Sequence, residues 1–213
     1  MNVRVLALVG GFSVSAFVTV SLFARHAAVQ PDLPYYDSAE LTPRWHDVSH
    51  RVAPFVMTTQ MGESLSSGDL EGRVYVASFI YTRCSVVCPR LVQSLKEVAS
   101  AISDPRLTIL SFSVTPDQDP PEVLAEFGRE RSILPTRWKL LTGEQAAIYD
   151  LARSSFFADD GRLSGTGIEN EFLHTEKLVL VDQHGKIRGV YNGSQRFDVE
   201  HLISDAGRLL KGR

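Results

Sequence analysis

The sequence has little cysteine, little excess charge and no proline after Pro135. Only two cysteines occur in 213 residues, Cys84 and Cys88. They cannot form the disulfide framework of a small secreted domain, and they lie too close together to brace a large loop. The net charge of −3 gives no basic surface of the kind that binds nucleic acid. We therefore expect no nucleic-acid partner, and we expect the cysteines to take part in chemistry.

The longest stretch without charge lies at the N-terminus, from Val5 to Phe23. As a helix with a rise of about 1.5 Å per residue, it would just span a hydrocarbon core of about 30 Å. Arg25 and His26 stand where a cleaved signal peptide would have small residues. We predict an uncleaved membrane anchor in residues 1–25, with a cleaved signal peptide as the alternative.

Two regions follow the anchor. Residues 26–50 contain several prolines and aromatic side chains, which indicates an extended tether that lies against a domain. Residues 51–213 have the mixed composition of one globular domain, without internal repeats or low-complexity runs.

The domain is predicted to contain strands and helices in the order β-α-β-α-β-α-β-β-α. We expect strands at residues 74–81, 107–114, 138–143 and, as a hairpin, 177–191, and helices at 89–103, 120–127, 144–154 and, capped by Asp198, 198–211. Strands that alternate with helices form parallel pairs through right-handed crossovers, and a hairpin adds antiparallel strands. The pattern therefore predicts an α/β fold, a thioredoxin-like domain behind an N-terminal transmembrane anchor.

Both cysteines fall between the first of these strands and a helix whose entry is marked by Pro89. A helix N-terminus carries partial positive charge, and Arg83 and Arg90 flank the pair. We therefore expect Cys84 or Cys88 to be rich in thiolate near neutral pH. Two buried, inert thiols are the alternative.

The four-residue spacing restricts what the two sulfurs can do. Residues four apart in one helix have Cβ atoms about 5 to 6 Å apart, whereas a relaxed disulfide needs about 3.5 to 4.5 Å. Cys84 should therefore lie in the turn, off the helix, if the pair is to oxidise. A metal ion between the two thiolates tolerates the wider gap. Thiolates favour Cu(I), whereas zinc in a closed site takes four ligands.

His174 is the candidate for a third ligand, because it stands just before the predicted strand that begins at Lys177. In thioredoxin-like oxidoreductases the corresponding loop carries a cis-proline that packs against the cysteines, and here no proline is present. An imidazole at this place could point at the cysteine pair. A surface or core histidine is the alternative.

Four other side chains could bind metal. His46 and His50 have the spacing of one helical face but belong to the tether. Met57 and Met61 could be thioether ligands, although alternation in a strand explains them more simply.

Four blocks of sequence occur in the order typical of one family. They are Phe79-Ile-Tyr-Thr-Arg-Cys-Ser-Val-Val-Cys-Pro89, Ser111-Phe-Ser-Val-Thr-Pro-Asp-Gln-Asp-Pro-Pro-Glu-Val-Leu124, Trp138-Lys-Leu-Leu-Thr-Gly143, and His174 before a Leu-Val-Asp-x-x-Gly hairpin. Over about residues 50–211 the chain resembles the SCO/SenC copper chaperones.

The resemblance implies a membrane-anchored thioredoxin-like domain in the periplasm or the intermembrane space. It further implies copper, as Cu(I) or Cu(II), bound by Cys84, Cys88 and His174. The expected partners are cytochrome c oxidase subunit II, whose binuclear copper site would receive copper or have its cysteines reduced, and a thiol–disulfide reductant.

The chain departs from the family at three places. Many members have Pro-Asp where Ser85-Val86 stands, Asp where Leu173 precedes the histidine, and Asp at the position of Thr115. These acidic residues could support ligands or dock partners, so their loss bears on affinity and client.

Other functions remain open from the sequence. The main rival is a metal-independent thiol–disulfide oxidoreductase that uses Cys84 and Cys88 as a redox pair, and a copper or redox sensor would need the same site. A peroxiredoxin is disfavoured, because Tyr81 stands where that family has threonine. Apart from thiol–disulfide reductase activity, we do not expect an enzyme.

Overall fold

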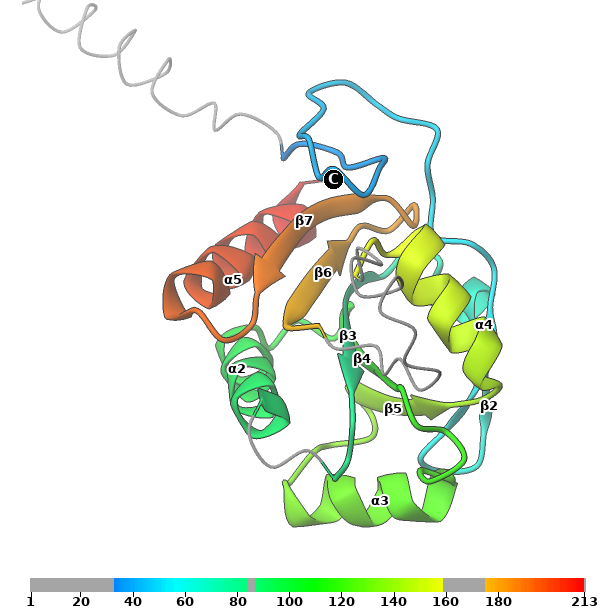
Figure 1. Cartoon of the computed structure of the whole chain (residues 1–213). Coiled ribbons are helices and arrows are strands. Elements are labelled where there is room, and N and C mark those ends of the chain that lie inside the picture. The colour runs from blue at the N-terminus through cyan, green and yellow to red at the C-terminus, as the bar shows by residue number, and fades with distance from the viewer. Residues whose placement is uncertain (1–32, 84–86, 159–174, 213) are drawn as a thin grey trace, which may run out of the picture. The chain divides into compact units, whose positions relative to one another are not determined.

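The computed structural model describes residues 33–83, 87–158 and 175–212, which belong to one compact unit beginning at Leu33 (Figure 1). Its elements are β1 (Val56–Thr59), β2 (Ser64–Ser66), the 3-10 turn η1 (Ser67–Leu70), β3 (Val74–Ile80), α2 (Val87–Ala101), β4 (Leu107–Ser113), α3 (Pro121–Glu130), β5 (Trp138–Thr142), α4 (Gln145–Asp150), the π-helical turn η2 (Leu151–Ser155), β6 (Lys177–Val181), β7 (Ile187–Asn192) and α5 (Arg196–Lys211).

The described strands form one sheet in the order β2-β1-β5-β4-β3-β6-β7. β3 pairs in parallel with β4, and β4 with β5, through the crossover helices α2 and α3. β6 runs antiparallel to β3, and β7 antiparallel to β6. These pairings confirm the predicted mixed α/β domain. The β1–β2 hairpin extends the sheet beyond β5.

Both faces of the central strands are buried, which explains their continuous apolar sequences. Along β3, Val76 and Ile80 pack with α2, α3 and α5 on one face, while Ala77 and Phe79 pack on the other. The phenylalanines of the second face stack closely, as in the pair Phe79 and Phe112, whose ring centroids are 5.4 Å apart. Side chains therefore cover both faces of β3 and β4.

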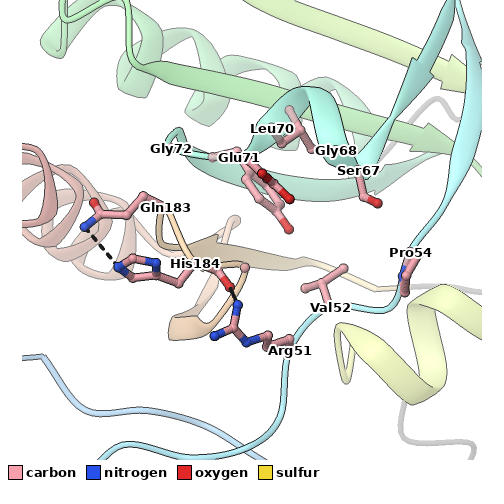
Figure 2. A pocket seen from close by; sticks show the side chains of 12 residues that line it. Arg51, Val52, Pro54, Ser67, Gly68, Leu70, Glu71, Gly72, Gln183 and His184 are labelled. Carbon is pink, nitrogen blue, oxygen red and sulfur yellow. Dashed lines mark hydrogen bonds between the residues drawn. The ribbon is translucent and has the colours of Figure 1, made fainter.

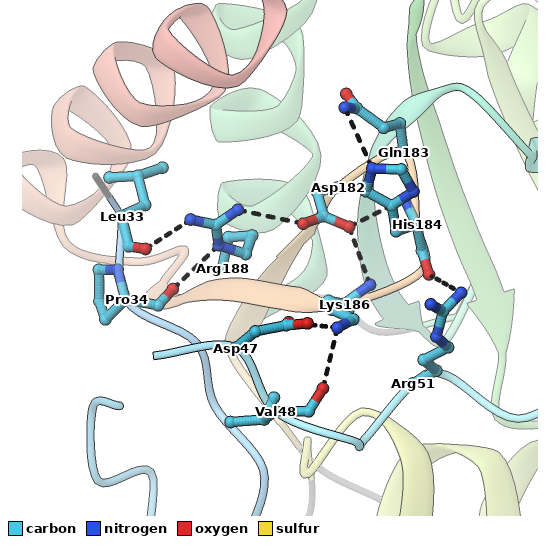
Figure 3. Close-up of polar contacts among 10 residues, drawn as sticks. All are labelled: Leu33, Pro34, Asp47, Val48, Arg51, Asp182, Gln183, His184, Lys186 and Arg188. Atoms are coloured by element: carbon cyan, nitrogen blue, oxygen red, sulfur yellow. Dashed lines mark hydrogen bonds and ion pairs between the residues drawn. The ribbon is translucent and has the colours of Figure 1, made fainter. Parts of the chain in front are cut away.

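The segment after Leu33 is fastened to the β6–β7 hairpin by Arg188 (Figure 3). The buried guanidinium donates hydrogen bonds to the carbonyl oxygens of Leu33 and Pro34 and pairs with the Asp182 carboxylate at 3.1 Å. It also lies 3.9 Å from the centre of the Tyr35 ring. Residues assigned to the tether from the sequence thus contact the domain through buried polar groups.

Lys186 fastens the same segment further along the chain (Figure 3). Its ammonium donates to the carbonyl oxygen of Val48 at 2.9 Å and pairs with Asp47, and the hydrogen bond lowers the pKa of that carboxyl. A β-bridge between Tyr36 and Ile187 adds a backbone contact. The segment therefore follows a defined path over the hairpin.

Two helix starts differ from expectation. α5 begins at Arg196 with Gln195 at its N-cap, so the predicted cap at Asp198 is wrong. Asp198 lies in the first turn instead and accepts the backbone N–H of Asn192 at 2.7 Å. α2 is described from Val87, which makes the predicted entry residue Pro89 its third residue.

The predicted anchor, Val5–Phe23, lies outside the described residues. In the part of the chain that the structure describes, no helix combines the length and apolar character needed to cross a bilayer.

Candidate functional site

Cys88 lies in the first turn of α2, beside the carboxyl end of β3. Its side chain is 8% exposed, and its sulfur accepts the backbone N–H of Tyr81 at 3.4 Å. An N–H donor and a helix N-terminus both stabilise negative charge on sulfur. The local structure therefore places two groups that stabilise a thiolate beside this sulfur.

The other two predicted ligands, Cys84 and His174, lie outside the described residues. Their nearest described neighbours are Arg83, which is exposed, and Thr175. Because β6 runs antiparallel to β3, its first residue, Lys177, lies towards the end of β3 that leads to Tyr81. Arg83 and Thr175, the described residues next to the two predicted ligands, therefore lie towards the same end of the sheet.

A buried carboxylate fixes the turn that leads to Cys84. Asp119 is fully buried and accepts hydrogen bonds from the hydroxyl groups of Thr82 at 2.5 Å, Ser113 at 2.5 Å and Thr115 at 3.0 Å. It thereby ties the end of β3 to the loop between β4 and α3. Asp119 appeared in the sequence motif without a role, and Thr115, where the family often has Asp, acts here as a hydrogen-bond donor.

Asp119→Ala is expected to destabilise the fold by about 3 kcal/mol, because hydrogen bonds to a charged group contribute about 1.5 to 3 kcal/mol each and burial of the carboxylate offsets part of that gain. Denaturant unfolding measures the change. Asp117→Ala, two residues earlier and exposed, is the matched control. A loss below about 1 kcal/mol would show that the three hydroxyls find other partners.

Of the four alternative metal ligands, His50 and Met57 pack against other groups, whereas His46 and Met61 are exposed. His50 Nε2 is 3.0 Å from the carbonyl oxygen of Ser155, and its ring packs against Phe157. Met57 is buried in the core, whereas Met61 is 58% exposed. Among the residues that the structure describes, no three His, Cys, Asp or Glu side chains are grouped to hold a metal ion.

Two hollows lie at opposite ends of the sheet. A groove of about 300 Å³ runs between Thr82, Arg83 and the face of α3 that carries Val123 and Phe127. A larger cavity of about 520 Å³ lies at the opposite end of the sheet, around the β6–β7 turn (Figure 2). Cys88 does not line this cavity, so the cavity is not part of the candidate metal site despite its larger volume.

Residues 45–211 match the SCO1/SenC family. The SCO1 protein homolog of Bacillus subtilis (strain 168) is 30% identical over 161 residues, covering 74% of this chain and 82% of the relative.

Solved structures agree with this match. A SCO1/SenC family lipoprotein from Bacillus anthracis is 30% identical with a TM-score of 0.65, covering 76% of this chain and 96% of that one. BsSco, described as a cytochrome c oxidase assembly protein with a disulfide switch, is 28% identical with a TM-score of 0.66, covering 79% and 98%. ScoI from Bradyrhizobium japonicum, solved with copper bound, shares the fold at 22% identity and a TM-score of 0.57, covering 75% and 99%. From its sequence and its fold, this chain belongs to the SCO1/SenC family.

Proposed function

We propose that this protein binds copper through Cys84, Cys88 and His174 and serves cytochrome c oxidase subunit II, either by delivering copper to its binuclear site or by reducing the cysteines of that site. The observation that carries the proposal is the position of Cys88. Its buried sulfur receives a backbone N–H at a helix N-terminus, which suits a thiolate ligand for Cu(I).

The strand register supports His174 as the third ligand. In the β3–β6 pair, Tyr75 lies opposite Val181 and Ala77 opposite Val179. Continuing this register in steps of two leads from Ala77 to Tyr81 on one strand and from Val179 to Thr175 on the other. Tyr81 donates its N–H to Cys88, and His174 is bonded directly to Thr175, about 3.8 Å away between Cα atoms.

Family membership supports the client. BsSco is named among the cytochrome c oxidase assembly proteins, and ScoI has been solved with copper. The disulfide switch of BsSco favours a second function for the same pair, thiol–disulfide exchange with a partner protein. In that role Cys84 and Cys88 would cycle between dithiol and disulfide, with electrons supplied by an external thiol reductant.

We also propose that residues 5–23 anchor the protein in a membrane, with the domain in the periplasm or an equivalent space. The uncharged sequence is long enough for this, and the relative from B. anthracis is a lipoprotein.

Anaerobic copper titration of the full chain in detergent tests the proposal, with His174→Ala beside the wild type. Two thiolates still hold Cu(I), which accepts low coordination, whereas Cu(II) prefers a nitrogen ligand and a fuller shell. We expect the Cu(II) affinity to fall by more than about 100-fold, beyond the 10- to 100-fold cost typical of losing an outer-shell partner. The Cu(I) affinity should change little.

His184→Ala is the control, because this exposed histidine lies in the β6–β7 turn at the other end of the sheet. Equal Cu(II) affinity in His174→Ala and the wild type would remove the third ligand and favour the oxidoreductase function.

A further inference from the structure

Gly193 connects the two segments that lead to Cys88 and His174. It follows the last residue of β7. Its backbone N–H donates to the carbonyl oxygen of Glu176 at 2.7 Å, and its own carbonyl oxygen accepts the hydroxyl of Ser94, on α2, at 2.7 Å. One residue therefore binds both α2 and the chain just before β6.

This position requires glycine because of space. A Cβ atom here would lie 2.3 Å from Cδ1 of Leu91, 3.1 Å from the carbonyl oxygen of Glu176 and 3.1 Å from Cγ of Leu178. Carbon atoms in normal contact are about 3.5 to 4.0 Å apart. The positive-φ glycines described are at other positions, so backbone conformation does not explain this one. Leu91 is fully buried and cannot simply turn into solvent.

The neighbours of Gly193 are close in sequence to the proposed ligands. Leu91 lies three residues after Cys88, which is one turn of α2 or about 4.5 Å along its axis. Glu176 lies two residues after His174, at most about 7 Å of extended chain. A side chain placed between Leu91 and Glu176 would push α2 away from Glu176, which follows the proposed ligand His174 by two residues.

We propose that Gly193 is a positioning residue that sets the spacing between the first turns of α2, which carry Cys88, and Glu176, and so tunes the site for Cu(II) relative to Cu(I). The inference rests on the proposed function. A wider spacing between α2 and Glu176 weakens the binding of Cu(II), which needs the imidazole, more than the binding of Cu(I), which two thiolates can hold. Gly193 touches no metal and acts only through the packing of α2 against the start of β6.

The test is Gly193→Ala in the full chain, titrated with Cu(I) and Cu(II) under anaerobic conditions. We expect the Cu(II) affinity to fall by about 10- to 100-fold, as for other residues that support metal ligands, with less than about 3-fold loss for Cu(I). The reduction potential of the metal-free cysteine pair should stay near that of the wild type, because Cys84 and Cys88 both precede Leu91 within one short segment. Gly207→Ala is the matched control, because a Cβ atom at Gly207, on α5, meets nothing within 4 Å.

Relief of the clash provides a second measurement. Leu91→Val removes the atom nearest to the new methyl group, so the Gly193→Ala, Leu91→Val double variant should regain most of the Cu(II) affinity lost in Gly193→Ala. Should Gly193→Ala fail to fold, Ser94→Ala decides the matter. It deletes the hydrogen bond to the Gly193 carbonyl without adding bulk, and it should weaken Cu(II) about 3- to 10-fold more than Cu(I), below the cost of the larger disturbance.

The outcomes separate this inference from the proposed function. Equal losses for both copper states in Gly193→Ala, or an unchanged Cu(II) affinity, overturn the positioning role while wild-type copper binding stands. If Gly193→Ala does not fold, an unchanged ratio of Cu(II) to Cu(I) affinity in Ser94→Ala likewise overturns the positioning role. A wild type that binds neither copper state overturns the proposed function itself.

Discussion

Oxidation of Cys84 and Cys88 to an intramolecular disulfide is expected to abolish Cu(I) binding. A sulfur must be a thiolate to bind the metal, and the disulfide removes both thiolates at once, leaving one imidazole. The loss should be complete within the range of a competition titration and should reverse on reduction. Cu(I) loading against a chelator, with thiol counting on the same sample, measures both changes.

The control is Cys84→Ser, which retains Cys88 but cannot form the internal disulfide. The same oxidant should leave its weaker Cu(I) binding unchanged under conditions that block dimer formation. Undiminished Cu(I) loading of the oxidised wild type would contradict the shared use of both sulfurs.

Asp182→Ala is expected to lower the free energy of unfolding by about 3 to 5 kcal/mol, the usual cost of removing one partner of a buried ion pair. Asp182 and Arg188 have side chains 5% and 6% exposed, so the substitution would remove a carboxylate that pairs with a buried guanidinium. The carboxylate also accepts the backbone N–H groups of His184 and Lys186, which shape the β6–β7 turn. Denaturant unfolding followed by circular dichroism measures the change.

Glu200→Ala is the matched control, because its ion pair with Arg196 is exposed and such pairs contribute at most about 1 kcal/mol. Replacing both members of the buried pair, as Asp182→Ala with Arg188→Met, should cost less than the sum of the single changes. Similar losses in Asp182→Ala and Glu200→Ala would show that the fold does not depend on the buried ion pair of Asp182 and Arg188.

The fold could be predicted from the sequence where burial dictates the pattern. β3 and β4 are covered on both faces, so their apolar runs were unambiguous, and the turn chemistry before Lys186 predicted the last hairpin. Helix starts were less secure. Asp198 looks like a cap in the sequence, but its carboxylate accepts the backbone N–H of Asn192, the last residue of β7.

The site was predicted in part for the same reason. The place of Cys88 follows from local order, strand then helix, and the structure agrees. The role of Asp119 depends on hydroxyl groups from separate segments, and the need for glycine at position 193 depends on Leu91, a hundred residues away. Neither the contacts of Asp119 nor the contact between positions 193 and 91 can be read from a single sequence. His50 has the spacing of a metal ligand in the sequence, but in the fold its ring nitrogen lies beside the carbonyl oxygen of Ser155.

The hydrogen bond from Arg188 to Leu33 fixes where the described domain begins relative to Cys88. Arg188 lies by the turn of the β6–β7 hairpin, near the start of β3, whereas Cys88 lies beyond the end of that strand. Seven strand residues at about 3.3 Å each separate these two ends by about 20 Å. Leu33, the first residue of the described domain, therefore lies at the end of the sheet remote from the sulfur. A partner protein that docks over Cys88, as the proposed function requires, would therefore approach the end of the domain opposite Leu33.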